Sequence, residues 1–110
     1  MSVVFVSHAF SSNPPGHARR VSQIARELSL GGNLPLAPQI YLPQFLDEAT
    51  ERDLALRLSL VLVRLSGEVR VYGEPSAGMR LEIAEAHRLG IPVGAGDEKG
   101  RLSLFEESTR

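Results

Sequence analysis

The sequence contains no cysteine among its 110 residues. Without cysteine the chain can form no disulfide framework, and it can supply neither a thiolate ligand to a metal nor a cysteine nucleophile to a reaction. The absence is also typical of proteins from a reducing compartment. Any chemistry of this chain therefore uses other side chains.

The sequence also lacks a strong charge of either sign and a long apolar run. Its net charge is −1, so no electrostatic pattern favours polymeric nucleic acid or an anionic membrane as a partner. No apolar run approaches the ~20 residues of a membrane-spanning helix, and no basic, cleavable leader precedes the first one. With 43% hydrophobic and 23% charged residues, we expect one soluble, cytoplasmic domain over residues 1–110.

Four short apolar runs predict β-strands, and a fifth run could add one more. Val3–Val6 is continuous and rich in β-branched residues, which is typical of a strand buried on both faces. Leu34–Ala37 is short and ends before a proline, whereas Val69–Tyr72 begins with alternating apolar positions. We expect the fourth strand at Ile91–Val93 and an edge strand at Leu102–Phe105.

Three longer segments have the spacing of amphipathic helices. They run from about His17 to Leu30, from about Thr50 to Leu65, and from about Met79 to Leu89. Glycines, which accept the left-handed backbone conformation, end the first and the third of these helices. Gln39–Glu48 has poor periodicity, so we expect a loop there with at most one helical turn.

The helix expected over residues 50–65 is apolar nearly all round. Such a helix is usually covered on more than one side, and in so small a protein another subunit is the expected second cover. The spacing places the core face of this helix at Leu54, Leu58, Val61 and Leu65.

Strands that alternate with helices favour a parallel sheet with right-handed crossovers and helices on both faces. We therefore expect an α/β fold, a three-layer sandwich with a four- or five-stranded parallel sheet. Sheets of this kind bind their ligands at the carboxyl ends of the strands. The loops that follow Val6, Ala37 and Tyr72 should meet there.

Glu82 is the best candidate for chemistry in the sequence. It lies beside the apolar stripe of the third helix, near the helix start, where that helix faces the carboxyl end of the preceding strand. Residues 73–78, rich in glycine, proline and serine, form the turn between the two elements. The alternative is a solvated glutamate on an amphipathic helix.

The loop after the first strand is a second candidate site. Ser11 and Asn13 precede a helix that carries Arg19 near its start. Free backbone N–H groups at a helix start, small hydroxyl side chains and a nearby arginine are suited to a phosphate or carboxylate. The alternative is an ordinary capped loop, with Asn13 as N-cap and Pro14 as the first helical residue. The loop lacks the glycine pattern of a dinucleotide fingerprint or a P-loop.

Two ring side chains could take part in binding. His8 follows the first strand directly and should point into the mouth of the cleft, where a histidine can exchange protons near neutral pH. Tyr41 could stack on a nucleobase. A polar loop residue and a packing residue are the respective alternatives. No histidines and carboxylates are spaced as metal ligands, so we expect neither a metal nor another cofactor.

Three segments together resemble a known superfamily. They are Val-Phe-Val-Ser-His-Ala-Phe-Ser-Ser-Asn-Pro at residues 4–14, Leu-Pro-Leu-Ala-Pro-Gln-Ile-Tyr at residues 34–41, and Tyr-Gly-Glu-Pro-Ser-Ala-Gly-Met-Arg-Leu-Glu-Ile-Ala-Glu-Ala at residues 72–86. Over about residues 3–93 the chain is similar to small relatives of the nucleoside 2-deoxyribosyltransferases and the deoxynucleoside monophosphate N-glycosidases.

The resemblance implies a flavodoxin-like or Rossmann-like fold, a homodimer or a multiple of dimers, and a nucleoside or nucleotide as the ligand. It implies that Glu82 is the nucleophile, because the matching glutamate of that superfamily follows a glycine that corresponds to Gly78. By position, it also implies ligand contacts at Ser7, at His8 and in the turn from Ser76 to Gly78, with Ser76 and Gly78 as the candidates.

Cleavage of an N-glycosidic bond passes through an oxocarbenium-like centre at C1′, which an ionised carboxylate can stabilise or capture. We expect a position near a helix N-terminus to favour the ionised form of Glu82. A second acid normally protonates the departing base. The related enzymes carry an aspartate on the preceding helix, where this sequence holds Leu58 and Ser59. Asp53 and Asp47 lie upstream, and neither matches that position cleanly.

Two hypotheses of different class follow. In the first, the protein is a hydrolase or transferase that acts on 2-deoxynucleosides or their 5′-monophosphates, with Glu82 as nucleophile and Asp53 as a candidate proton donor. In the second, it is a non-catalytic nucleotide-binding or regulatory module that has the same fold and cleft.

Overall fold

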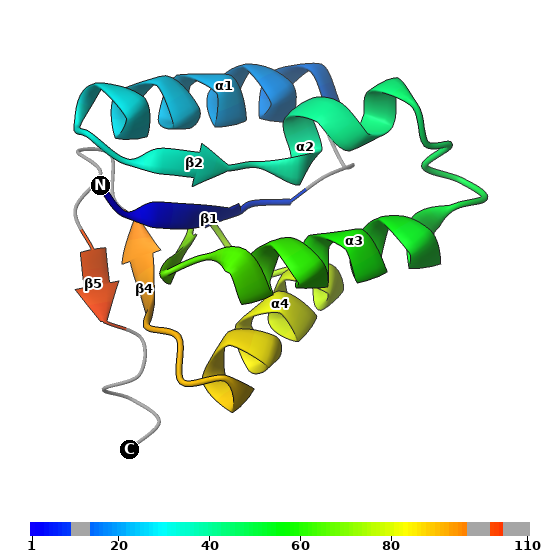
Figure 1. Ribbon diagram of the computed structural model, residues 1–110. Coiled ribbons are helices and arrows are strands. Elements are labelled where there is room, and N and C mark those ends of the chain that lie inside the picture. The colour runs from blue at the N-terminus through cyan, green and yellow to red at the C-terminus, as the bar shows by residue number, and fades with distance from the viewer. Residues whose placement is uncertain (10–13, 97–101, 105–110) are drawn as a thin grey trace.

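The computed structural model describes residues 1–9, 14–96 and 102–104, and a five-stranded sheet lies at its centre (Figure 1). The strand order is β2-β1-β3-β4-β5, in which the first four strands are parallel and β5 is antiparallel to β4. This order is that of flavodoxin-like sheets, so the predicted α/β fold is confirmed, with an antiparallel fifth strand. The strands are β1 (Val3–Ser7), β2 (Leu34–Leu36), β3 (Glu68–Val71), β4 (Val93–Gly96) and β5 (Leu102–Leu104).

The helices cover both faces of this sheet. Figure 1 shows α1 on one side of β1 and β2, and α3 with α4 on the other side. No helix among the described residues is long and apolar enough to cross a membrane. The helical elements are α1 (Pro14–Leu30), α2 (Pro38–Tyr41), the short 3-10 helix η1 (Leu42–Gln44), α3 (Arg52–Leu65) and α4 (Ala77–Arg88).

The central strand β1 separates two apolar clusters. Its residues Val4, Phe5 and Val6 are completely buried, as the continuous apolar run predicts. Because side chains alternate between the faces of a strand, Val4 and Val6 pack beneath α1 while Phe5 packs on the side of α3 and α4. Burial of both faces therefore makes β1 the rigid base to which the flanking loops are attached.

The ends of the first helix and of the segment after β2 differ in part from the sequence prediction. The first helix begins at Pro14 rather than near His17, since proline is favoured at the first helical position. Its end is as predicted: Gly32 has a positive φ of 86°, and the Asn33 N–H donates to the Leu28 carbonyl at 2.9 Å. The segment expected to be a loop is helical over residues 38–44, where α2 again begins with a proline.

The fourth strand lies two residues later than predicted. It spans Val93–Gly96 rather than Ile91–Val93, and Val93 is paired with Val69 of β3. The glycines at positions 94 and 96 weaken the strand pattern, because glycine is depleted in strands. Here the ring of Tyr72 occupies the space that a side chain at Gly96 would need, so packing favours glycine at this strand position.

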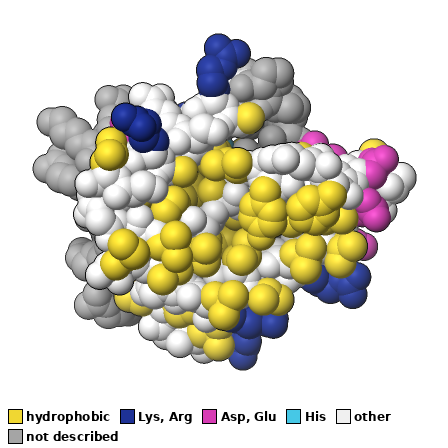
Figure 2. Space-filling view, turned by 45° about the horizontal axis from the view of Figure 1, so that its top comes forward, with side chains coloured by type: hydrophobic (Ala, Val, Ile, Leu, Met, Phe, Trp, Pro, Cys, Tyr) yellow, Lys and Arg dark blue, Asp and Glu magenta, His cyan; other side chains and the backbone are white. Residues whose placement is uncertain are grey.

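The predicted core face of α3 is wrong. Ser59 and Val63 are buried, whereas Val61 is 43% and Leu65 is 66% exposed. A helix that is apolar nearly all round gives its periodicity no unique direction, so packing against β1 and α4 selects the buried face. Figure 2 shows hydrophobic side chains spread widely over the middle of one face of the molecule, with charged side chains at its margins. Cover by a second subunit stays a prediction.

Candidate active site

A cavity of about 440 Å³ opens at the carboxyl end of β1, where the doubly wound fold predicts a ligand site. Four segments contribute to its wall: the end of β1, the η1 region with the loop that follows it, α3, and the beginning of α4. Lining residues from these segments include His8, Ala9, Leu42, Pro43, Asp53, Leu56, Ser59, Ser76, Gly78 and Glu82. The cavity thus brings together segments that are far apart in the sequence.

Glu82 lies in the wall of this cavity and is almost completely buried. Its residue is 3% exposed, and it shares the inward stripe of α4 with Met79 and Ala86, at helical spacings of three and four residues. The carboxylate oxygen Oε1 accepts a hydrogen bond from the Ser7 hydroxyl at 2.8 Å. The alternative of a solvated glutamate on the outer face of the helix is therefore excluded by the geometry.

Ser7 reaches Glu82 because it is the last residue of β1. It follows Phe5 by two positions, so its side chain is on the face of the sheet that α4 covers. Its carbonyl accepts a hydrogen bond from the Tyr72 N–H at 2.9 Å, which joins the ends of β1 and β3. Ser7 itself is completely buried. The serine and the carboxylate therefore form a polar pair within largely apolar surroundings.

Burial raises the pKa of the Glu82 carboxyl from 4.5 to about 7, and the hydrogen bond from Ser7 lowers it in part. We expected the position near the helix N-terminus to favour the ionised form of Glu82, but burial has the larger effect on its pKa and favours the protonated form. Glu82 is the sixth residue of α4, and the effect of the helix dipole falls off within the first turn. The loss of solvation of the buried carboxyl therefore has a larger effect on its pKa than the helix dipole has.

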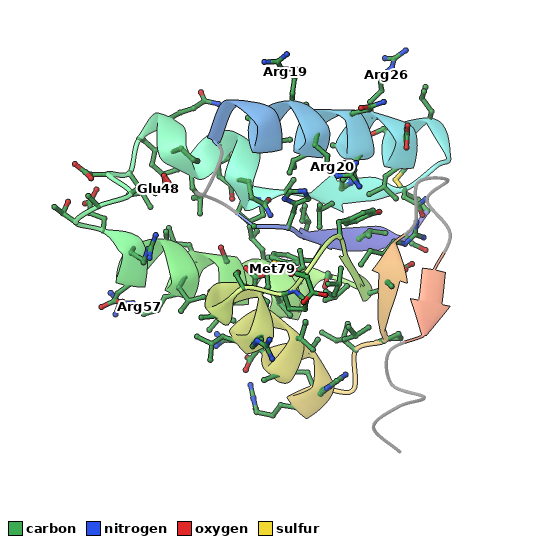
Figure 3. The ribbon with its side chains drawn as sticks, turned by 180° about the vertical axis from the view of Figure 1, so that it is seen from behind. Arg19, Arg20, Arg26, Glu48, Arg57 and Met79 are labelled. Carbon is green, nitrogen blue, oxygen red and sulfur yellow. The ribbon has the colours of Figure 1, made fainter. Side chains whose placement is uncertain are left out.

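The beginning of α4 is held by a reciprocal pair of contacts. The Ser76 hydroxyl oxygen accepts a hydrogen bond from the Met79 N–H at 3.2 Å, and the Met79 sulfur accepts one from the Ser76 N–H at 3.4 Å. This arrangement is a capping box with methionine in the place of the usual glutamate. Figure 3 shows Met79 at the start of α4, beside the sheet. Ser76 and Gly78 both line the cavity, and their contact with a ligand stays a prediction.

Of the site residues predicted in and near the first loop, the structure places His8 at the cavity and Arg19 away from it. His8 is 7% exposed and lines the cavity, and its Nδ1 lies 3.0 Å from the Ala9 carbonyl oxygen. Arg19 is exposed on the outer side of α1 and points away from the sheet (Figure 3), so the structure does not bring it to the cavity. Ser11 and Asn13 lie outside the described residues.

The two remaining predicted residues are both exposed. Asp53 lies in the first turn of α3 and lines the cavity. Tyr41 is 42% exposed and packs against Phe45, with their ring centroids 6.0 Å apart. It is adjacent in sequence to the lining residue Leu42 but is not part of the cavity wall.

Sequence reasoning did not select two buried polar residues of this region. Ser59 of α3 is 1% exposed, lines the cavity, and its hydroxyl has no hydrogen-bond partner among the described residues. Gln39 of α2 is 7% exposed and donates to two carbonyls at the end of β1. Two signals in the sequence could have indicated them. Ser59 is a polar residue between two leucines of a helix, and Gln39 directly follows the proline that bounds a predicted strand.

Comparison with known proteins gives a family and a fold. The family described as Domain of unknown function (DUF7768) matches residues 2–95. Among solved structures, a 2-deoxyribosyltransferase from Bacillus psychrosaccharolyticus superposes with a TM-score of 0.62 at 16% sequence identity, over 92% of this chain and 76% of that one. No curated protein matches the sequence. At this identity the structural match shows a shared fold.

Proposed function

Since the chain belongs to the family described as Domain of unknown function (DUF7768), we propose its function from the site and the fold. The proposed reaction is cleavage or exchange of the N-glycosidic bond of 2-deoxynucleosides or of their 5′-monophosphates. Glu82 is the nucleophile, and the cavity at the end of β1 is the substrate site. The fold shared with a 2-deoxyribosyltransferase supports this reaction class.

The observation that carries the proposal is the buried Glu82 carboxyl, held by Ser7 at 2.8 Å in the wall of a cavity. In the proposed reaction an oxygen of Glu82 attacks C1′ of the deoxyribose. The C1′–N bond breaks, and its electron pair leaves with the base, which takes up a proton. Water, or a nitrogen of a second base, then attacks C1′ and releases the carboxylate.

Low solvation of Glu82 suits this chemistry. A carboxylate with little water around it interacts more strongly with the positive charge that develops at C1′ than a solvated one does. Burial raises the pKa of Glu82 to about 7, so both the protonated and the ionised form of its carboxyl are populated near neutral pH. The positive charge that develops at C1′ as the glycosidic bond breaks favours the ionised form, because an opposite charge nearby lowers the pKa of a carboxyl.

Asp53 is the candidate proton donor for the departing base. It lines the same cavity from the first turn of α3. Because Asp53 is exposed, solvent can return a proton to it after each turnover. We therefore expect loss of Asp53 to slow base release less than loss of Glu82, which no water molecule can replace as the nucleophile in a covalent route.

The test is incubation of the protein with each deoxynucleoside and each deoxynucleoside monophosphate, followed by chromatography for released base. We expect release by the wild type and its loss in Glu82→Ala. Glu85→Ala is the matched control, because Glu85 is on the same helix but forms its ion pairs with Arg64 and Arg88 away from the cavity. Equal release by Glu82→Ala and the wild type would contradict the proposal.

A non-catalytic nucleotide-binding module is the alternative, and the position of Asp53 favours it. Glu82 is the only buried acidic residue among those that the structure describes. Asp53 lines the same cavity but is exposed, so the departing base has no buried, fixed proton donor among the described residues. Binding of a deoxynucleoside, measured by calorimetry, together with no release of base over hours, would support this alternative.

A further inference from the structure

The inference concerns how β1 stays extended up to Ser7 after its neighbour β2 has ended. β2 is three residues long, and its pairing with β1 ends at Phe5 and Leu36. In this ladder the Leu34 N–H donates to the Ser2 carbonyl at 2.8 Å. Donors of a parallel neighbour recur at every second residue, so the next ones come from residues 36 and 38. Residue 38 is a proline and has no N–H.

The backbone after Pro38 cannot continue the ladder either. The chain turns into α2 at this point (Figure 1), and the Ile40 N–H donates to the Ala37 carbonyl at 3.0 Å within that turn. The carbonyls of Val6 and His8 therefore face the edge that β2 has left, where the described segment after Pro38 does not continue the ladder. A buried carbonyl without a donor is destabilising.

The Gln39 side chain supplies both missing donors. Its Nε2 donates to the Val6 carbonyl at 3.1 Å and to the His8 carbonyl at 3.0 Å. The residue is 7% exposed, and its Oε1 has no hydrogen-bond partner among the described residues. Leaving a buried acceptor unpaired costs free energy, so the amide is retained for its two donor bonds.

These bonds enclose Ser7. The carbonyls before and after it are held by Gln39 on one side, while its own carbonyl accepts from the Tyr72 N–H on the other side. With three successive carbonyls held, the direction of the Ser7 side chain toward Glu82 is determined by the backbone. We infer that Gln39 is a positioning residue that keeps the Ser7 hydroxyl on the Glu82 carboxylate and holds His8 at the cavity.

This inference deepens the proposed function, since it matters for catalysis only if Glu82 is the nucleophile, but its test needs no turnover. The test is titration of the Glu82 carboxyl by ¹³C NMR in wild type, Gln39→Met, Ser7→Ala and the double variant. Methionine has the length of glutamine but no donor. Gln44→Met is the matched control, because Gln44 is exposed and donates to a single carbonyl, that of Ile40.

Loss of the Ser7 hydrogen bond raises the pKa of Glu82, because that bond favours the charged form. We expect Ser7→Ala and Gln39→Met each to raise it by about one pKa unit, the size of one buried hydrogen bond. If Gln39 acts through Ser7, the double variant shows no further increase. The other titratable side chains around the cavity are unchanged in every variant and include His8, Asp47, Glu48, Arg52 and Asp53.

Three results would overturn the inference. The first is a Gln39→Met variant that is less stable but titrates as the wild type does, which would leave Gln39 a purely structural role. The second is a double variant in which the two shifts add. The third is failure of both Gln39→Met and the shorter Gln39→Asn to fold, which would make Gln39 a folding residue.

Measurement of base release in the same variants separates this inference from the proposed function. If the wild type releases no base while the titration result is as expected, the proposed function fails and the role of Gln39 stands. If the wild type releases base while Glu82 titrates in Gln39→Met as it does in the wild type, the proposed function stands and the inferred role of Gln39 fails.

Discussion

Replacement of Glu82 by glutamine should change how the stability of this protein depends on pH. The carboxyl is 3% exposed, and burial raises its pKa from 4.5 to about 7. Below pH 4.5 the group is protonated in both the folded and the unfolded chain, so the wild type loses nothing. Between pH 4.5 and 7 the unfolded chain releases the proton while the folded chain keeps it. The wild type is therefore destabilised as the pH rises through this range.

The size of this loss follows from the two pKa values. Each pKa unit corresponds to about 1.36 kcal/mol, so the difference between about 7 and 4.5 amounts to about 3 kcal/mol. Above pH 7 both states are ionised and the loss stays constant. Glu82→Gln has no group to titrate at this position. Its stability relative to the wild type should thus increase by about 3 kcal/mol between pH 4 and pH 8.

The assay is urea-induced unfolding of both proteins at intervals from pH 4 to pH 8, and the quantity of interest is the difference in free energy of unfolding. Other groups titrate equally in both proteins and cancel in this difference. Glu74→Gln, at an exposed position in the turn before α4, is the matched control for the exchange itself. A difference that stays constant over the whole range would show that Glu82 is solvated, and the reasoning about the cavity would be wrong.

Two further predictions concern packing near the site. Gly96→Ala should lower the free energy of unfolding by about 2 kcal/mol, because its Cβ would overlap the Tyr72 ring; Gly67→Ala, where a Cβ meets only an ordinary contact at 3.6 Å, is the control. Equal effects of the two changes in urea unfolding would contradict this. Ser59→Ala should raise the free energy of unfolding by about 1 kcal/mol, because it removes a buried hydroxyl that has no hydrogen-bond partner in the described part of the chain. Its control is Ser29→Ala in α1, which removes an exposed hydroxyl bonded to the Ala25 carbonyl. If Ser59→Ala lowered the free energy of unfolding while Ser29→Ala did not, the Ser59 hydroxyl would form a stabilising hydrogen bond, and the prediction would be wrong.

Much of the architecture could be predicted because the local pattern and the tertiary environment agree. The apolar run of β1 has no polar face to expose, so a position between two layers of helices is its stable solution. Glu82 could be selected because it shares the inward stripe of its helix with apolar residues while the turn before it follows a buried strand. In both cases a few neighbouring residues contain the relevant information.

Where prediction failed, the deciding contact comes from a distant part of the chain. Packing against β1 and α4 determines the inward face of α3. Ser59 and Val63 are buried there, although the sequence pattern favoured other apolar residues of the helix. The glycine at position 96 of β4 is favoured by the ring of Tyr72, the residue that follows β3. The pKa of Glu82 depends on how completely other segments exclude water from its carboxyl, which its position in the helix does not reveal.

Periodicity and turn residues thus determined the order of elements and the side of α4 that faces inward, because they act over a few residues along the chain. Only the tertiary structure decided which groups meet at the end of β1. Ser7 and Glu82 are 75 residues apart in sequence, and the Gln39 amide that borders Ser7 comes from a third segment. Hydrogen bonds of about 3 Å between such segments exist only after the sheet has formed, since its twist and register set those distances.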